Sequence, residues 1–113
     1  LDSLVHGQWT SWPREDELWR TTCLEAFFAV PGESGYWELN LSPSRQMWNL
    51  YWFDGYRQPQ PPTPCMDFQL VGIRCERERL SAHLRTELKL NQLEVGLCAV
   101  IRRREGLSYF ALD

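Results

Sequence analysis

The sequence lacks the features that mark membrane and nucleic-acid proteins. No stretch of about 18 apolar residues occurs in the 113-residue chain, so no membrane-spanning helix is expected. The formal net charge is −3, whereas a duplex binder needs a basic surface to neutralise phosphates. The one basic run, 102–104, is followed at once by Glu105 and is typical of a solvated hairpin end. Neither a nucleic acid nor a membrane is therefore an expected partner.

Histidine is scarce, and no pattern typical of a catalytic or metal site is present. The two histidines, His6 and His83, lie beside no nucleophile motif such as Gly-x-Ser-x-Gly. No Cys-x-x-Cys pair, other metal-ligand spacing or phosphate-binding glycine loop occurs. The sequence therefore predicts a protein that is not an enzyme and that requires neither a metal nor a cofactor.

The four cysteines permit two interpretations. An even number allows two disulfides in a secreted chain, whereas buried free thiols suit a reducing compartment. No signal peptide is recognisable, which favours free thiols and predicts a cytoplasmic protein. The cysteines are Cys23, Cys65, Cys75 and Cys98.

Aromatic residues, in contrast, are abundant. Hydrophobic residues make up 43% of the chain and charged residues 24%, which is ordinary for a folded globular domain. Large aromatic side chains serve either as core or as flat binding platforms, and composition does not separate these uses. The six tryptophans are Trp9, Trp12, Trp19, Trp37, Trp48 and Trp52.

Alternation of apolar and polar residues predicts an all-β fold. Turns rich in proline and glycine recur between the alternating runs, as in an antiparallel β-sandwich. Residues 18–113 are expected to form the sandwich, and residues 1–17 a loop or short strand. In 68–76, the alternation places Phe68, Leu70, Gly72 and Arg74 on one face. Segment 80–87 also fits an amphipathic helix, but its neighbours favour a strand. Strands are predicted over 18–30, 36–42, 47–53, 68–76, 80–87, 93–101 and 107–112.

Three blocks carry a resemblance to a known family. The stretches LWRTTCLEAFF (18–28), YWELNLSP (36–43) and WNLYWFDGYR (48–57) resemble the DOMON-like proteins of cyanobacteria and proteobacteria, and 93–112 fits a later hairpin. The chain departs from the family pattern at Arg45 and at Gln58–Pro59. The family has strands before residue 18 and after Leu112 that this sequence does not match. The resemblance therefore implies a β-sandwich lacking edge strands, with apolar surface and unpaired backbone exposed.

Relatives of this family, including the family-nine carbohydrate-binding modules, bind sugars or haem. DOMON cytochromes hold haem through a methionine and a histidine. This chain offers Met47, Met66 and its two histidines, but none lies in a recognisable motif. The resemblance thus implies sugar binding rather than a haem cofactor.

Glu25, Glu38 and Asn40 are the expected polar part of a ligand site. They are predicted to lie together on one sheet face, where charged groups need partners or a ligand. One interpretation is hydrogen bonding to sugar hydroxyls. The other is a structural network that ties Glu25 or Glu38 to Arg57 or Arg20.

Trp48 and Trp52 are the expected aromatic part of that site. They are four residues apart and share a strand face with Leu50. Such a pair suits sugar stacking, but it equally suits a core or a protein interface.

Two functions follow from the sequence. The first is a non-catalytic domain that binds a carbohydrate or similar small polar ligand through Glu25, Glu38, Asn40, Trp48, Trp52 and Arg57. The alternative is a structural or interaction subunit of a larger assembly. It would dock onto a partner protein through its tryptophan-rich surface and open sheet edges.

Overall fold

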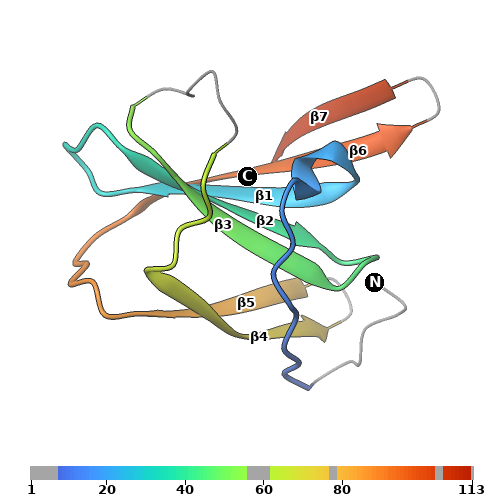
Figure 1. Ribbon diagram of the computed structural model, residues 1–113, viewed down its shortest axis with the longest axis horizontal. Helices are drawn as coiled ribbons and strands as arrows, with labels where there is room; N and C mark the ends of the chain where they lie inside the picture. Colours follow the sequence, from blue (N-terminus) through green and yellow to red (C-terminus); the bar gives the residue numbers. More distant parts are fainter. Residues whose placement is uncertain (1–7, 56–61, 77–78, 104–105, 113) are drawn as a thin grey trace.

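The protein consists of two antiparallel β-sheets that pack face to face (Figure 1). The structure, a computed structural model, describes residues 8–55, 62–76, 79–103 and 106–112, and it describes 98–103 and 106–112 by their backbone alone. Within these residues, no helix is long and apolar enough to cross a membrane. The elements are η1 Leu18–Arg20, β1 Cys23–Ala29, β2 Tyr36–Ser42, β3 Met47–Phe53, β4 Phe68–Glu76, β5 Arg79–Thr86, β6 Glu94–Arg103 and β7 Gly106–Leu112.

The strand order confirms the predicted all-β sandwich. The large sheet has the order β3-β2-β1-β6-β7, and the small sheet pairs β4 with β5. Strands β1 to β3 are joined by successive hairpins, the chain then crosses to the small sheet, and β6 returns beside β1. A fourth strand that returns beside the first of three hairpin strands is the Greek-key arrangement.

The strand prediction for 18–30 is wrong at its start. Leu18–Arg20 forms a 3-10 turn, in which the Thr21 amide donates to the Leu18 carbonyl, and β1 begins only at Cys23. Glu17, just before the turn, has a left-handed backbone with φ 61°, so the chain reverses there. The turn buries Leu18 completely, and this burial favours it over an extended chain.

The predicted strand at 68–76 forms, but its faces differ from the expectation. A β-bulge at Val71 shifts the register, so that Leu70 lies opposite Leu84 whereas Gly72 lies opposite His83. The core-facing residues are consequently Phe68 and Leu70 before the bulge, and Ile73 and Cys75 after it. The strand prediction for 80–87 is confirmed by β5.

The core lies between the small sheet and one face of β1, β2 and β3. In the large sheet, Phe28 lies opposite Trp37, and Leu39 lies opposite Leu50. Phe68 from the small sheet makes edge contacts with the rings of Phe28 and Trp37. The cluster comprises Trp12, Phe28, Trp37, Leu39, Leu41, Trp48, Leu50, Phe68, Leu70, Ile73 and Cys75.

The described part of the N-terminal segment joins the two sheets. Thr10 and Ile73 exchange backbone hydrogen bonds of 2.8 and 2.6 Å along β4. Further on, the Trp48 amide donates to the Pro13 carbonyl, and the Glu15 amide donates to the Trp48 carbonyl. This segment therefore lies along the edges of both β4 and β3.

Candidate functional site

The structure brings Glu25, Glu38 and Asn40 together on one face of the large sheet, the face turned away from the small sheet. Glu25 on β1 lies directly opposite Asn40 on β2, and Glu38 is two residues from Asn40 on the same strand. All three are buried, with exposed fractions of 7%, 1% and 0% for Glu25, Glu38 and Asn40. The three side chains therefore lie close together as predicted, but little of their surface is exposed to solvent.

The N-terminal turn covers this polar face. Element η1 packs on β2 (Figure 1). The Trp19 ring meets the Tyr51 ring edge-on, with ring centroids 5.3 Å apart. The Tyr51 hydroxyl donates to Asp16 Oδ1 and accepts a 3.2 Å hydrogen bond from the Glu17 amide. Burial, together with the bond to Asp16, raises the pKa of the Tyr51 phenol. These contacts separate the polar face from solvent.

Asn40 and Ser42 are under-satisfied on this face. Within the described residues, no hydrogen-bond partner meets either side-chain polar atom of Asn40 or the Ser42 hydroxyl. A buried polar group without a partner costs about 1–3 kcal/mol of stability. Asn49 on β3, opposite Asn40, is instead fully engaged, since it accepts from Arg14 and donates to the Glu15 carbonyl.

Arg14 forms the polar contact between the two sheets at the edge of β3. Its guanidinium donates to Asn49 Oδ1 at 3.0 Å and to the carbonyls of Cys65 and Phe68 at 2.9 and 2.6 Å. The guanidinium also lies 4.1 Å from the Trp48 ring centroid. Burial lowers the Arg14 pKa and raises the pKa of the neighbouring Cys65 thiol. These contacts give Arg14 a structural role.

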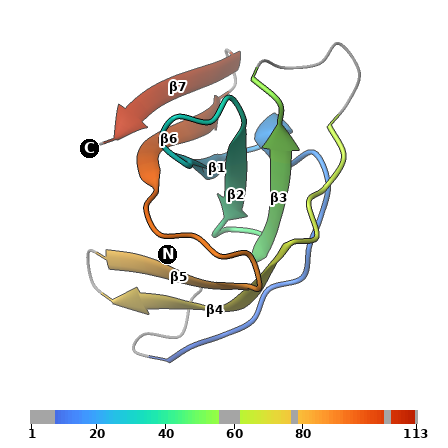
Figure 2. The same ribbon diagram turned by 90° about the vertical axis from the view of Figure 1, so that its left-hand side faces the viewer.

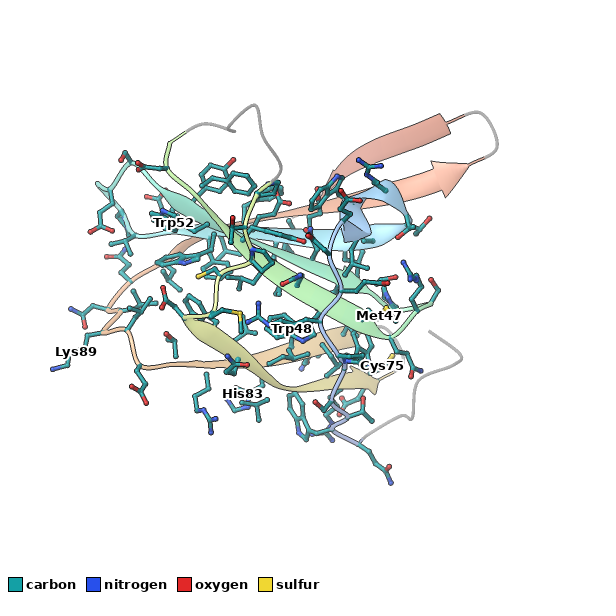
Figure 3. The ribbon with its side chains drawn as sticks, viewed as in Figure 1. Met47, Trp48, Trp52, Cys75, His83 and Lys89 are labelled. Carbon is teal, nitrogen blue, oxygen red and sulfur yellow. The ribbon has the colours of Figure 1, made fainter. Side chains whose placement is uncertain are left out.

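The two tryptophans lie on the opposite face of the sheet from the acidic residues. Trp37 pairs with Trp52 and Leu41 with Trp48, which turns both β3 tryptophans toward the small sheet (Figure 3). Trp48 is a core residue, only 3% exposed, whereas Trp52 is 40% exposed. The structure therefore does not combine the carboxylates and the tryptophans into one site. The remaining candidate, Arg57, lies outside the described residues.

An open pocket of about 450 Å³ lies at the exposed Trp52 ring. Trp52 and Trp37 line it from the sheet, with ring centroids 4.8 Å apart and planes at 58°. Gly35 lies beneath Trp52, and a Cβ at this position would overlap the indole ring. A glycine at position 35 therefore leaves the space that the Trp52 ring occupies.

Two loops supply the polar rim of the Trp52 pocket. The β1–β2 turn contributes Glu33 beside Val30 and Pro31, and the β5–β6 connection contributes 88–92. Figure 3 shows Lys89 at the same end of the molecule as Trp52. Their side chains offer one carboxylate, one ammonium and two amides to a ligand, through Glu33, Lys89, Asn91 and Gln92.

Leu88 connects this pocket to a second one. A pocket of about 370 Å³ extends from Leu88 to polar residues of β4 and β5, including Gln69 and Arg85. Volumes of this size lie within the usual range for small-molecule sites, about 300–1,000 Å³. The sequence predicts Trp52 as a site residue but none of the loop residues, because their loops carry no recognisable motif.

Cysteines and acidic residues form no further site in the described chain. Cys23, Cys65 and Cys75 are free thiols. No group of three His, Cys, Asp or Glu side chains among the described residues could hold a metal ion.

Comparisons of the chain with models of known protein families, with curated proteins and with solved structures found no match.

Proposed function

We propose that the chain binds a carbohydrate, or a similar small polar ligand, in the Trp52 pocket. The observation that supports this proposal is an exposed indole, held by Trp37 and Gly35, on the wall of an open pocket. An indole presents an apolar face to the C–H side of a sugar ring, while amides and charged groups hydrogen-bond its hydroxyls. Asn91 and Gln92, which line the pocket, carry such amides.

The location of the polar groups differs from that expected from the sequence. Glu25, Glu38 and Asn40 are buried beneath η1, whereas Glu33, Lys89, Asn91 and Gln92 border an open pocket. Solvent access therefore favours the loop residues as the ligand's partners. The resemblance to carbohydrate-binding relatives remains a prediction that agrees with this chemistry. The free thiols likewise support a reducing, cytoplasmic setting for such a non-catalytic domain.

The alternative, an interaction subunit, has its own supporting observation. Val95 and Leu97 on β6 are exposed although they lie on the core-facing side of the large sheet. Exposed apolar residues that continue a core are typical of a protein-docking surface.

Replacing Trp52 tests the pocket directly. A glycan array identifies a bound sugar, and titration of that sugar then compares Trp52→Ala with the unaltered chain. We expect affinity to fall at least about tenfold, which corresponds to about 1.4 kcal/mol. Gly35→Ala, which displaces the ring without removing it, should also weaken binding.

Trp9→Ala is the matched control for this experiment. Trp9 is also exposed, but it lies against His83 on the small sheet rather than in the pocket. Equal losses from Trp9→Ala and Trp52→Ala would contradict the proposed site. A chain that binds no glycan on the array would contradict carbohydrate as the ligand.

A further inference from the structure

The two sheets differ in width, and the narrower one leaves part of the core-facing surface uncovered. On β1, Phe28 is buried, whereas its neighbour on β6, Val95, is 64% exposed. Ala26 packs against the core, and its β6 neighbour Leu97 is 40% exposed. The cover given by β4 and β5 therefore ends near β1, and apolar side chains of β6 lie beyond it.

Among the described residues, no strand pairs with the edge of the small sheet next to this uncovered surface. Thr10 pairs with Ile73 and so occupies the far edge of β4. Strand β5, in the described part of the chain, pairs with β4 alone. Figure 2 shows β5 on the side of the small sheet nearer β6. Because strands lie about 4.8 Å apart and packed sheets about 10 Å apart, a strand added to β5 would lie over Val95 and Leu97.

The side chains of β5 indicate what kind of strand would fit. Leu80 and Leu84 pack against the core, so the alternating positions Arg79, His83 and Arg85 point to the outer face. Figure 3 shows His83 on this outer side. Neither Arg79 nor Arg85 makes an ion pair with any described residue. No acidic residue occurs within β5, although the whole chain has a net charge of −3.

We propose that β5 pairs with an extended segment of another protein, in which apolar and acidic residues alternate. Its backbone would hydrogen-bond the open edge of β5, as in other cases of β-strand addition. Its apolar side chains would cover Val95 and Leu97, and its acidic side chains would lie beside Arg79 and Arg85 on the outer face. This interaction is separate from ligand binding at Trp52 and does not depend on it.

Labelled peptides test this proposal by fluorescence anisotropy on the full chain. A seven-residue peptide of alternating valine and glutamate should bind. The same peptide with lysine in place of glutamate should bind at least about tenfold more weakly, because it meets arginine side chains. A third peptide, with N-methyl groups on alternate residues, should lose binding because it cannot donate the backbone hydrogen bonds.

Variants of the chain locate the contact. Val95→Asp combined with Leu97→Asp should reduce affinity for the acidic peptide at least about tenfold. Val71→Asp is the matched control, since Val71 is also exposed but lies on the bulge of β4. Arg79→Glu combined with Arg85→Glu should reverse the preference toward the lysine peptide. Far-ultraviolet circular dichroism confirms that each variant is folded.

Several outcomes would overturn the proposal. These are failure of the acidic peptide to bind, equal binding of the acidic and lysine peptides, or equal effects of the β6 and Val71 variants. Sedimentation of the free protein as a dimer that Val95→Asp dissociates would also overturn it, because a second copy would then cover this face. If a β6 variant fails to fold, the peptide comparisons on the unaltered chain still test the proposal.

Discussion

The two faces of strands β1 to β3 differ in the side chains that they carry and in how far those side chains are exposed to solvent. One face carries carboxylates, amides and a hydroxyl, yet η1 and the N-terminal segment cover it. The other face carries tryptophan and leucine, yet it ends in the exposed ring of Trp52. The polar face is thus interior, and the apolar face supplies the candidate site. Residue type alone therefore does not identify a binding surface, because loops and termini decide which side chains meet solvent.

The largest difference in stability is expected between single substitutions of the two tryptophans of β3. Trp48→Ala should lower the free energy of unfolding by about 3–5 kcal/mol, since it opens a cavity in the core and removes the ring beside Arg14. Trp52→Ala should cost less than about 1 kcal/mol, because its ring is already half in solvent. Urea unfolding of both variants measures the difference, and equal losses would remove the distinction between core and site.

An intermediate effect should distinguish the two buried amides of the covered face. Asn49→Leu should lower the free energy of unfolding by about 2–3 kcal/mol, because Arg14 and the Glu15 carbonyl lose their partner. Asn40→Leu should instead raise it, by up to about 3 kcal/mol, because it removes a buried amide to which no described residue bonds. Urea unfolding checks both, and a large loss for Asn40→Leu would show that a bound polar molecule satisfies it.

The smallest effect at neutral pH is expected at Tyr51, and it should grow in alkali. Burial and the bond to Asp16 raise the pKa of the phenol above its ordinary value of about 10. Between the unfolded and folded pKa values, the unfolded chain releases the proton that the folded chain retains. Stability should therefore be fully present below about pH 10 and fall as the pH rises further.

Tyr51→Phe removes this titration. It should cost about 1 kcal/mol at pH 8, through loss of the hydrogen bonds to Asp16 and Glu17, and should reduce the alkaline decline. Unfolding at pH 8 and pH 11 measures both quantities. Tyr36→Phe is the matched control, since its ring packs on Phe53 on the same face of the sheet. An unchanged pH dependence in Tyr51→Phe would contradict the expected burial of the phenol.

Local alternation was sufficient to predict most strands, because each half-buried strand repeats with a period of two residues. It failed where long-range contacts decide the backbone. Leu18 extends the apolar pattern of β1, but it lies in a 3-10 turn because the turn buries it against β2. Val71 continues the pattern of β4, but the bulge there reverses the faces that follow. The turn at Leu18 has no local signal in the sequence, whereas Gly72, an isolated glycine within a strand, is a weak signal of the bulge.

The separation of carboxylates and tryptophans could have been predicted. The four-residue turn 43–46 places Ser42 opposite Met47, so even-numbered residues of β2 pair with odd-numbered residues of β3. Glu38 and Asn40 must then point away from Trp48 and Trp52. The loop residues of the Trp52 pocket could not have been predicted in this way. The β1–β2 turn and the β5–β6 connection meet only because the sheets pack.

The pairing of Thr10 with Ile73 also bears on how the chain folds. The two residues are 63 positions apart, and Arg14 reaches across 54 positions to the Phe68 carbonyl. Contacts between distant residues require large loops to close before they add stability, which slows folding. The N-terminal segment leaves the ribosome well before its partner on β4, and it cannot dock until the small sheet has formed. Until then the edges of β3 and β4 are unprotected, and encounters between nascent chains at these edges are the expected route to aggregation.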